Sequence, residues 1–199
     1  ALQDFGFAMG PFLVADMSGL DIAWRMRQRL AATRNPRERY VEISDRLCEA
    51  GRLGQKTGRG AFLYREGSRD PVPDPEVEAL ISAESRRLGI ERRPIESAQI
   101  VERCILALIN EGARLLEEGI ASTAADIDVI WCSGYGFPRQ RGGPMFHADT
   151  LGLSTVLAGI ERLAAVHGAN YWTPAPLLVE LARQGGSFAW HDRQRLKAA

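Results

Sequence analysis

The sequence has no excess of charge of either sign and no long apolar run. Its 25 lysine and arginine residues balance 25 aspartate and glutamate residues, so the formal net charge at pH 7 is zero. A balanced charge argues against nucleic-acid binding and against a polybasic membrane surface. No apolar run approaches the roughly 20 residues that a membrane-spanning helix requires. We therefore expect no nucleic-acid partner and no membrane span.

The amino terminus also lacks the features of a targeting segment. The opening residues, ALQDFGFAMGPF, have neither the basic start nor the apolar core of a secretory signal. The first residue is Ala1 rather than an initiator methionine, and the sequence begins in the middle of a motif. We therefore expect a piece of a longer protein.

Cysteine and histidine are too few and too scattered for a disulfide scaffold or a metal centre. The three cysteines are widely spaced among apolar residues: Cys48, Cys104 and Cys132. This pattern indicates reduced thiols in a cytosolic protein. The three histidines have no metal-ligand spacing: His147, His167 and His191. No Cys-x-x-Cys pair occurs either, so no metal site is expected.

Nucleotide-binding fingerprints are missing as well. The chain contains neither G-x-G-x-x-G after a strand-like run nor G-x-x-x-x-G-K-[ST]. These glycine patterns let a backbone approach phosphate groups closely. We therefore expect this chain to bind no dinucleotide by itself.

A repeat organises what the sequence does contain. Residues 134–153, GYGFPRQRGGPMFHADTLGL, are echoed in shorter form by residues 6–20, GFAMGPFLVADMSGL. At a constant offset, Gly10 and Pro11 align with Gly143 and Pro144, and Asp16 aligns with Asp149. In both copies Gly-Pro opens an apolar segment and Gly-Leu starts a second one, as expected of two helices separated by a break. The Asp16, Asp149, Gly143 and Pro144 set is therefore interpreted as a structural repeat.

The remaining pattern is helical. Apolar periodicity, caps and stops predict helices over residues 11–17, 20–30, 37–50, 75–88, 95–118, 123–132 and 154–167, and a last helix that starts at Thr173-Pro174 and stops at Gly185-Gly186. On the longest of these, Ile100, Cys104, Leu108, Ala113 and Leu116 are expected near one face. No alternating strand pattern stands out, so the fold class is all-α. Residues 67–75 form the best linker between residues 1–66 and 76–199 because they are rich in proline and charge.

The polar residues offer little acid–base machinery. His147 lies near Asp149, but the first copy has Val14 in its place, which favours a half-buried structural role over catalysis. Asp126 and Asp128 point to different faces of a helix, so charge stabilisation at the helix start is favoured over a carboxylate pair. For the two repeat aspartates we favour a partly buried carboxylate that accepts hydrogen bonds from loop amides. No catalytic residue is assigned.

Three stretches carry a family resemblance: residues 9–22 (MGPFLVADMSGLDI), 51–64 (GRLGQKTGRGAFLY) and 102–149 (ERCILALINEG through PMFHAD). They resemble the C-terminal region of 3-hydroxyacyl-CoA dehydrogenase, and specifically the tandem C-terminal domains of multifunctional fatty-acid β-oxidation enzymes that also carry an enoyl-CoA hydratase domain. The resemblance implies two duplicated helical modules of the 6-phosphogluconate dehydrogenase C-terminal-domain-like fold. Residues 1–66 would be the first module and residues 76–199 the second.

The resemblance also implies that the dehydrogenase chemistry resides elsewhere in the longer protein. The family transfers hydride to NAD with a His–Glu pair and an Asn. None of these three residues falls within the matching part of this chain. Where the second module would place the Asn, this sequence has Glu102, followed by Arg103. The duplicate site is therefore expected to be inactive. NAD is expected in the full-length enzyme and none on this fragment.

The resemblance leaves two roles for this chain. It would form one wall of the acyl-CoA cleft, and it would provide a packing surface for other domains. The cleft residues suggested by the resemblance are Met9, Gly10, Pro11 and Phe12. Expected partners are upstream Rossmann and enoyl-CoA hydratase domains, the acyl-CoA substrate and a second copy in a homodimer. We expect a cytoplasmic, bacterial protein. A free-standing helical interaction module without catalytic activity is the rival interpretation, and the helical domain of another β-hydroxyacid dehydrogenase is disfavoured because it would lack the GYGFPRQRGGP copy.

Arg139 and Arg141 lie in an insertion that the first copy lacks, framed by Pro138 and Gly142. Their guanidinium groups could contact a CoA phosphate, clamp a carboxylate of a neighbouring domain or remain in solvent. We favour domain docking, because the loop belongs to the copy that lacks the Asn.

Overall fold

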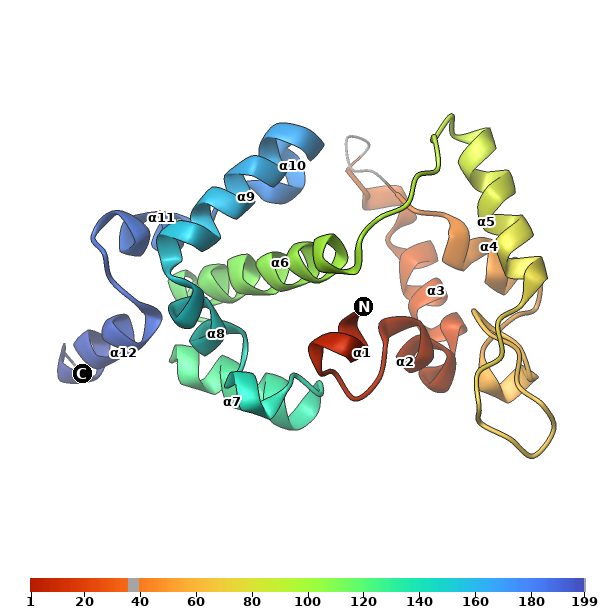
Figure 1. The fold of residues 1–199 in the computed structure, drawn as a ribbon, viewed down its shortest axis with the longest axis horizontal. Coiled ribbons are helices and arrows are strands. Elements are labelled where there is room, and N and C mark those ends of the chain that lie inside the picture. Colours follow the sequence, from red (N-terminus) through yellow and green to blue (C-terminus); the bar gives the residue numbers. More distant parts are fainter. Residues whose placement is uncertain (36–39, 199) are drawn as a thin grey trace. The chain divides into compact units, whose positions relative to one another are not determined.

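The structure is a computed structural model that describes residues 1–35 and 40–198 (Figure 1). Within these residues the chain is helical, and its extended structure amounts to three isolated bridges that join Gly54 to Arg59, Arg59 to Leu63, and Leu63 to Val72. The all-α prediction is confirmed. The chain divides into two compact units, which we call the N-terminal unit (Met9–Pro94) and the C-terminal unit (Ala1–Ala8 with Ile95–Ala199).

The N-terminal unit contains α2 (Pro11–Ser18), α3 (Leu20–Arg29), the 3-10 turn η1 (Ala31–Thr33), α4 (Ile43–Glu49), the 3-10 turn η2 (Gln55–Thr57) and α5 (Pro75–Arg87). Of the helix expected over residues 37–50, the segment 36–39 lies outside the described residues, and α4 begins at Ile43. A small core holds the helices together through Leu20, Leu47, Cys48 and Val77. The unit is thus a short helical bundle with a turn-rich loop between α4 and α5.

The C-terminal unit contains α1 (Leu2–Phe5), α6 (Ser97–Glu117), α7 (Ala124–Gly134), η3 (Arg139–Arg141), α8 (Pro144–Leu151), α9 (Leu153–His167), α10 (Ala169–Trp172), α11 (Pro176–Arg183) and α12 (Phe188–Ala198). The capping box expected for α7 is present, since the Thr123 hydroxyl and the Asp126 carboxylate each accept the other residue's backbone N–H. The helix expected to stop at Gly185-Gly186 is α11, which ends at Arg183, but the prediction that it is the last helix is wrong, because α12 follows. Its sequence, FAWHDRQRLKA, has no clear apolar stripe, so periodicity did not reveal it.

Both copies of the repeat form a helix, a glycine break and a second helix. Gly19 separates α2 from α3 with φ 97° and ψ 117°, and Gly152 separates α8 from α9 with φ 84° and ψ 125°. A positive φ of this kind strongly favours glycine. The shared backbone conformation at the break supports the alignment of the two copies.

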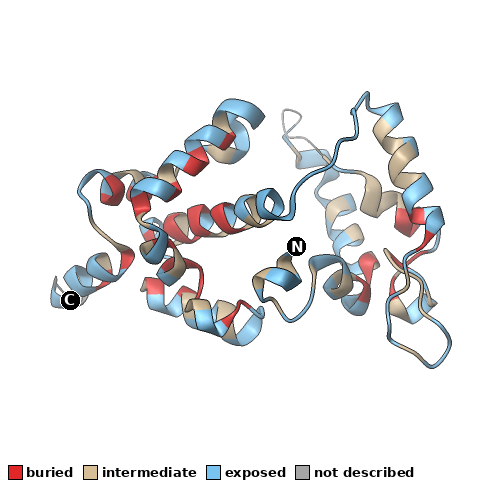
Figure 2. Ribbon diagram, in the orientation of Figure 1, coloured by how far each residue is buried: buried red, intermediate tan, exposed pale blue. Residues whose placement is uncertain are grey.

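Helix α6 is the centre of the larger core. Its buried apolar residues follow a helical spacing, with Ile105, Ile109, Ala113 and Leu116 each at most 3 % exposed (Figure 2). The expected face differs at its first turns, because Ile100 is 39 % exposed and Cys104 is only partly buried. Apolar residues surround the middle of α6, so periodicity alone could not select the face that packs.

The expected linker is an ordered part of the N-terminal unit. Val72 pairs with Leu63 through two backbone hydrogen bonds of 2.9 Å, and the Asp74 carboxylate caps α5 by accepting the N–H of Glu76. The compact units place α5 with α4, and they place residues 1–8 with the second copy. The modules 1–66 and 76–199 were defined by sequence resemblance, whereas the two units are defined by contacts in space. The division into modules therefore stays a prediction.

None of the helices in residues 1–35 and 40–198 is both long enough and apolar enough to cross a membrane.

Three aspartates of the C-terminal unit connect three helices in a closed ring, which we call the Asp ring (Asp128, Asp149 and Asp192). Asp128 on α7 accepts the first free N–H groups of α8, at 2.7 and 2.9 Å. Asp149 on α8 accepts those of α12, at 2.8 and 3.0 Å, and Asp192 on α12 accepts those of α7, at 3.0 and 3.3 Å. Each carboxylate satisfies orphan donors at a helix start and lies at the positive end of a helix dipole.

We expect the stability of the C-terminal unit to depend on pH through the titration of Asp128 in the Asp ring. Burial and, to a smaller extent, the charges of Asp149 and Asp192 raise the pKa of this carboxyl to about 6, against the lowering effect of its two N–H bonds. A carboxyl whose folded pKa is raised contributes stability that is present below its unfolded pKa of 3.8 and is lost as the pH rises through about 6.

Asparagine does not titrate. The wild type should therefore lose stability relative to Asp128→Asn as the pH rises. The unfolding free energy of the variant minus that of the wild type should increase by roughly 1–3 kcal/mol between about pH 4 and about pH 7. Urea unfolding at several pH values measures this difference. A difference that stays constant over the range would contradict a raised pKa.

Candidate functional site

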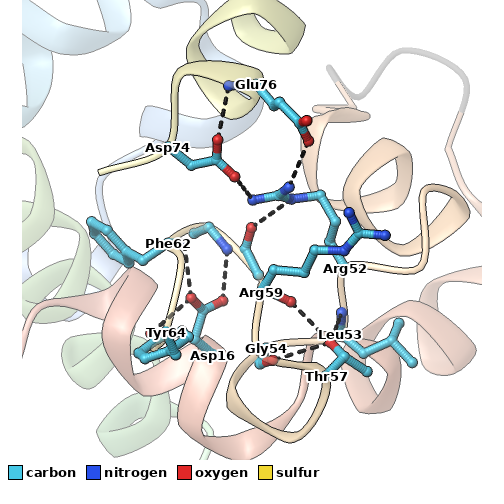
Figure 3. Close-up of polar contacts among 12 residues, drawn as sticks. Asp16, Arg52, Leu53, Gly54, Thr57, Arg59, Phe62, Tyr64, Asp74 and Glu76 are labelled. Carbon is cyan, nitrogen blue, oxygen red and sulfur yellow. Dashed lines mark hydrogen bonds and ion pairs between the residues drawn. The ribbon is translucent and has the colours of Figure 1, made fainter. Parts of the chain in front are cut away.

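A buried carboxylate organises the N-terminal unit (Figure 3). Asp16, on α2, is 1 % exposed. It accepts the backbone N–H groups of Ala61 at 2.8 Å and Phe62 at 3.0 Å, and the hydroxyl of Tyr64 donates to it at 2.9 Å. A buried carboxylate is tolerated only when its oxygens are satisfied in this way. Asp16 therefore attaches the glycine-rich loop, residues 51–64, to α2.

The glycines of this loop permit that close approach. A Cβ atom on Gly54 would lie 2.2 Å from the backbone oxygen of Asp16, and one on Gly60 would lie 2.0 Å from its carboxylate. Gly54 also has φ 98° and ψ −156°, a backbone region that is essentially restricted to glycine. The GRLGQKTGRG sequence is thus a packing requirement of Asp16 rather than a phosphate-binding loop.

Arg52 makes a second set of buried polar contacts with the same loop (Figure 3). Its side chain, 4 % exposed, forms an ion pair with Asp74, whose side chain is 3 % exposed, and donates to the carbonyl of Gly60 at 3.0 Å. Burial would raise the pKa of Asp74, but the bonds from the Glu76 N–H and from Arg52 outweigh it and lower that pKa. The pair therefore stays charged and ties the segment before α5 to the loop.

Tyr64 is the other titratable group beside Asp16. Burial, with the hydrogen bond to Asp16, raises its pKa to about 12. Such a phenol remains protonated at neutral pH and is committed to a structural bond, so it is a poor acid–base catalyst. The Asp16 cluster is a structural centre.

The four cleft residues expected from the resemblance lie where α2 begins. Gly10 has an extended backbone at the helix start and Pro11 occupies the first helical position. Met9 is 36 % exposed and Phe12 is 67 % exposed. Together they form a largely exposed start of α2.

The C-terminal unit contains a groove of about 330 Å³ beside α6, α8 and α9. Its apolar lining includes Val101, Ile105 and Val156. Glu102 and Arg162 form an ion pair of 2.6 Å at this groove. Glu102, which stands where the family resemblance would place an Asn, is therefore engaged by a neighbouring cation.

His147 belongs to an aromatic cluster rather than to an acid–base pair. Its ring lies 5.6 Å from that of Phe5 and 6.4 Å from that of Phe137. Burial, and then the charge of Arg141, lowers the pKa of the imidazole. Asp149, two residues later in the sequence, instead accepts the backbone N–H of Phe188 at the start of α12. A neutral, packed His147 agrees with the structural role expected for it.

The two arginines of the insertion have different environments. Arg141 donates from Nε to the carbonyl of Phe5 at 3.1 Å, and its guanidinium carbon lies 3.9 Å from the centre of the Phe5 ring. Arg139 is exposed. Arg141 therefore holds α1 within its own unit through a carbonyl and a ring, whereas the expected partner was a carboxylate of another domain.

The model of the 3-hydroxyacyl-CoA dehydrogenase C-terminal domain matches residues 1–64 and 100–187. The chain belongs to that family. The resemblance noted in the sequence is thereby confirmed. The first matched segment includes residues 1–8, which pack in the C-terminal unit, so sequence family and compact unit divide the chain differently at its start.

Known relatives of this dehydrogenase-family chain are multifunctional enzymes. It is 42% identical to the peroxisomal bifunctional enzyme of Danio rerio, over 100% of this chain and 29% of that protein. It is also 42% identical to the Homo sapiens enzyme of the same name, over 92% of this chain and 27% of that protein. The chain thus spans less than a third of the length of these relatives.

Among solved structures, the dehydrogenase part of multifunctional enzyme 1 from C. elegans is similar, with a TM-score of 0.69, 26% identity, and coverage of 90% of this chain and 40% of that one. The peroxisomal names of the curated eukaryotic relatives overturn one expectation. The prediction of a cytoplasmic, bacterial protein is wrong. It rested on the scattered cysteines and on the lack of a secretory signal in the opening residues, neither of which identifies a compartment.

Three structural residues were not found from the sequence: Asn110, Arg52 and Asp192. Buried Asn110 donates to the carbonyl of Thr173 at 2.9 Å and accepts the N–H of Ala175 at 2.8 Å, which fixes the start of α11 on α6. An asparagine within an apolar helical run is the signal that could have revealed it, because a buried amide requires partners. Arg52 stands in a glycine-rich loop and Asp192 in a polar helical segment, where a charged residue gives no signal of burial.

Substituting Gly54 should test the approach of the loop to Asp16. We expect Gly54→Ala to lower the unfolding free energy by about 3 kcal/mol or more, from backbone strain together with overlap on the Asp16 backbone. Gly51→Ala is the matched control, since Gly51 also has a positive φ, of 70°, but has nothing within 4 Å of an added Cβ. It should cost only about 1–2 kcal/mol. Equal losses in urea unfolding would show that the contact with Asp16 is unimportant.

Arg141→Gln should loosen α1. Loss of the hydrogen bond to Phe5 and of the ring contact should cost about 1–2 kcal/mol, since each such interaction is worth roughly 0.5–1.5 kcal/mol. Arg139→Gln, at an exposed neighbouring position, should change stability by less than about 0.5 kcal/mol. Thermal unfolding and hydrogen exchange of residues 2–7 measure both. Similar effects of the two substitutions would argue against the Phe5 contact.

Proposed function

We propose that this chain forms the C-terminal helical part of a 3-hydroxyacyl-CoA dehydrogenase that acts in fatty-acid β-oxidation within a multifunctional enzyme. It contributes one wall of the acyl-CoA cleft and packing surface for the other domains, and it has no dehydrogenase activity alone. The observation that carries the proposal is the family match over residues 1–64 and 100–187, together with relatives named as bifunctional enzymes.

NAD belongs to another part of the enzyme in this proposal. A dinucleotide requires a strand, a glycine turn and a helix start that together cradle its pyrophosphate. The described residues of this helical chain offer no such element. The chain's own residues therefore shape and close the cleft, while hydride transfer to NAD takes place on the missing domain.

The wall of the cleft is assigned to the entrance of α2. Met9 presents an apolar side chain there, and Gly10 and Pro11 leave the backbone open to a ligand. Phe12, which is 67 % exposed, adds a second apolar side chain to the same wall. Exposed Arg139 docks another domain of the longer enzyme in this proposal.

A domain exchange tests the proposal. The homologous region of the Danio rerio bifunctional enzyme is replaced by this chain, and 3-hydroxyacyl-CoA oxidation with NAD and enoyl-CoA hydration are assayed separately. We expect the chimera to keep both activities. Deleting the region should abolish the dehydrogenase while the hydratase, on its own domain, continues.

Two further measurements bear on the details. The isolated chain should show no saturable heat when titrated with NAD and no turnover of acetoacetyl-CoA with NADH. In the chimera, Met9→Glu should raise the KM for acyl-CoA by about tenfold, on the scale of one buried apolar contact. A chimera with a sound hydratase and no dehydrogenase would favour a separate interaction module.

A further inference from the structure

The groove beside α6, α8 and α9 in the C-terminal unit has an aliphatic floor and room for a ligand. Ile105 and Leu106 of α6 and Val156 of α9 line it, and each is at most 5 % exposed. Its volume of about 330 Å³ falls within the range of about 300–1,000 Å³ that is usual for ligand pockets. The proposed function gives this groove no role, because the acyl-CoA wall is assigned to α2 in the other unit.

The start of α6 brings positive charge to the groove. Ala98, in the first turn of α6, lines it. The first N–H groups of a helix have no partner within the helix and lie at the positive end of its dipole. Glu96 occupies the cap position of α6 but makes no side-chain capping bond, and the first turn contains no acidic residue. An anionic group at this place would satisfy the free donors and the dipole together.

Arg162 of α9 adds a full positive charge to the same groove. Its Nη2 atom donates to Glu102 at 2.6 Å, and the two side chains are 58 % and 45 % exposed. A guanidinium group has five N–H donors, so Arg162 is able to donate to a second carboxylate as well. An ion pair this exposed is weak, and water solvates Glu102 when a competing anion displaces it.

The other polar side chains of the groove do not repel an anion. Among the described residues that line it, Glu102 is the only acidic one. Burial, and then the charge of Arg141, lowers the pKa of His147, so this imidazole is neutral at pH 7. Thr155 carries no charge. The groove therefore combines an aliphatic floor with a site for one negative group.

We propose that this groove binds a fatty carboxylate, which is a single aliphatic chain that ends in a carboxylate group. The chain lies on Ile105, Leu106 and Val156. The carboxylate accepts hydrogen bonds from the free N–H groups at the start of α6 and from Arg162. This ligand differs from the acyl-CoA of the proposed function, because a thioester has no charge at the end of its acyl chain.

Octanoate and 1-octanol test the site, because they share the chain length and differ in the head group. The whole chain is titrated with each in a calorimeter, and the amide resonances of Ser97 and Ala98 are followed by NMR. We expect octanoate to bind saturably and at least about threefold more tightly than 1-octanol. Only octanoate should shift the two amide resonances. Equal affinities, or unshifted amides, would overturn the carboxylate assignment, and an absence of saturable binding would overturn the site.

Filling the groove provides a second test. Ala98→Trp should weaken the binding of octanoate and of 1-octanol by about tenfold, because the indole takes the space of several methylene groups. Ala107→Trp is the matched control, since Ala107 is also an exposed alanine of α6 but does not line the groove. It should leave both affinities unchanged. Equal effects of the two substitutions would place the ligand elsewhere. Circular dichroism checks that both variants keep the helical fold.

The ion pair at the groove supplies a test of sign. Arg162→Gln should weaken octanoate binding by about threefold, and Glu102→Gln should strengthen it by about threefold, because it removes the competing carboxylate. Neither change should alter the affinity for 1-octanol. A pair with a purely structural role would make the two substitutions act in the same direction, and that result would overturn the part assigned to Arg162.

Discussion

The structure depends on one recurring interaction, in which an aspartate on one helix accepts the backbone N–H groups of a different segment. Asp16 does this for the glycine-rich loop, and the Asp ring does it three times for helix starts. Short helices with modest apolar faces are marginal by themselves. A carboxylate fixes the position of the segment it binds and removes the cost of orphan donors. These contacts explain how helices as short as α8 and α12 keep defined places.

Local signals in the sequence predicted the helices well where caps and glycine breaks are strong. The Thr123–Asp126 capping box and the breaks at Gly19 and Gly152 are local, so neighbouring residues suffice to predict them. The packing face of α6 and the existence of α12 were missed for a different reason. The side of α6 that packs is chosen by tertiary partners, and α12 is held at its start by Asp149, a residue 39 positions earlier.

The candidate site likewise combines residues that the sequence singled out with partners that it could not identify. The repeat singled out Asp16 and Asp149, because a polar residue retained in two apolar segments stands out. The partners of these aspartates could not be read from the sequence, and neither could the bond from Asp192 to Ala124, which joins residues 68 positions apart. Arg141 was predicted to dock another domain, whereas its acceptor is the backbone carbonyl of Phe5 in its own unit, a group that every residue carries and that no sequence pattern marks.

The closed form of the Asp ring has a consequence for how the C-terminal unit opens. In a linear series of contacts, an end helix can detach while the others stay in place. In a ring each helix is both an acceptor and a donor, so releasing α7, α8 or α12 breaks contacts on two sides and exposes helix-start amides to solvent. The three helices should therefore behave as a single foldon, with amide exchange at their first turns governed by one shared opening equilibrium instead of three separate fraying events.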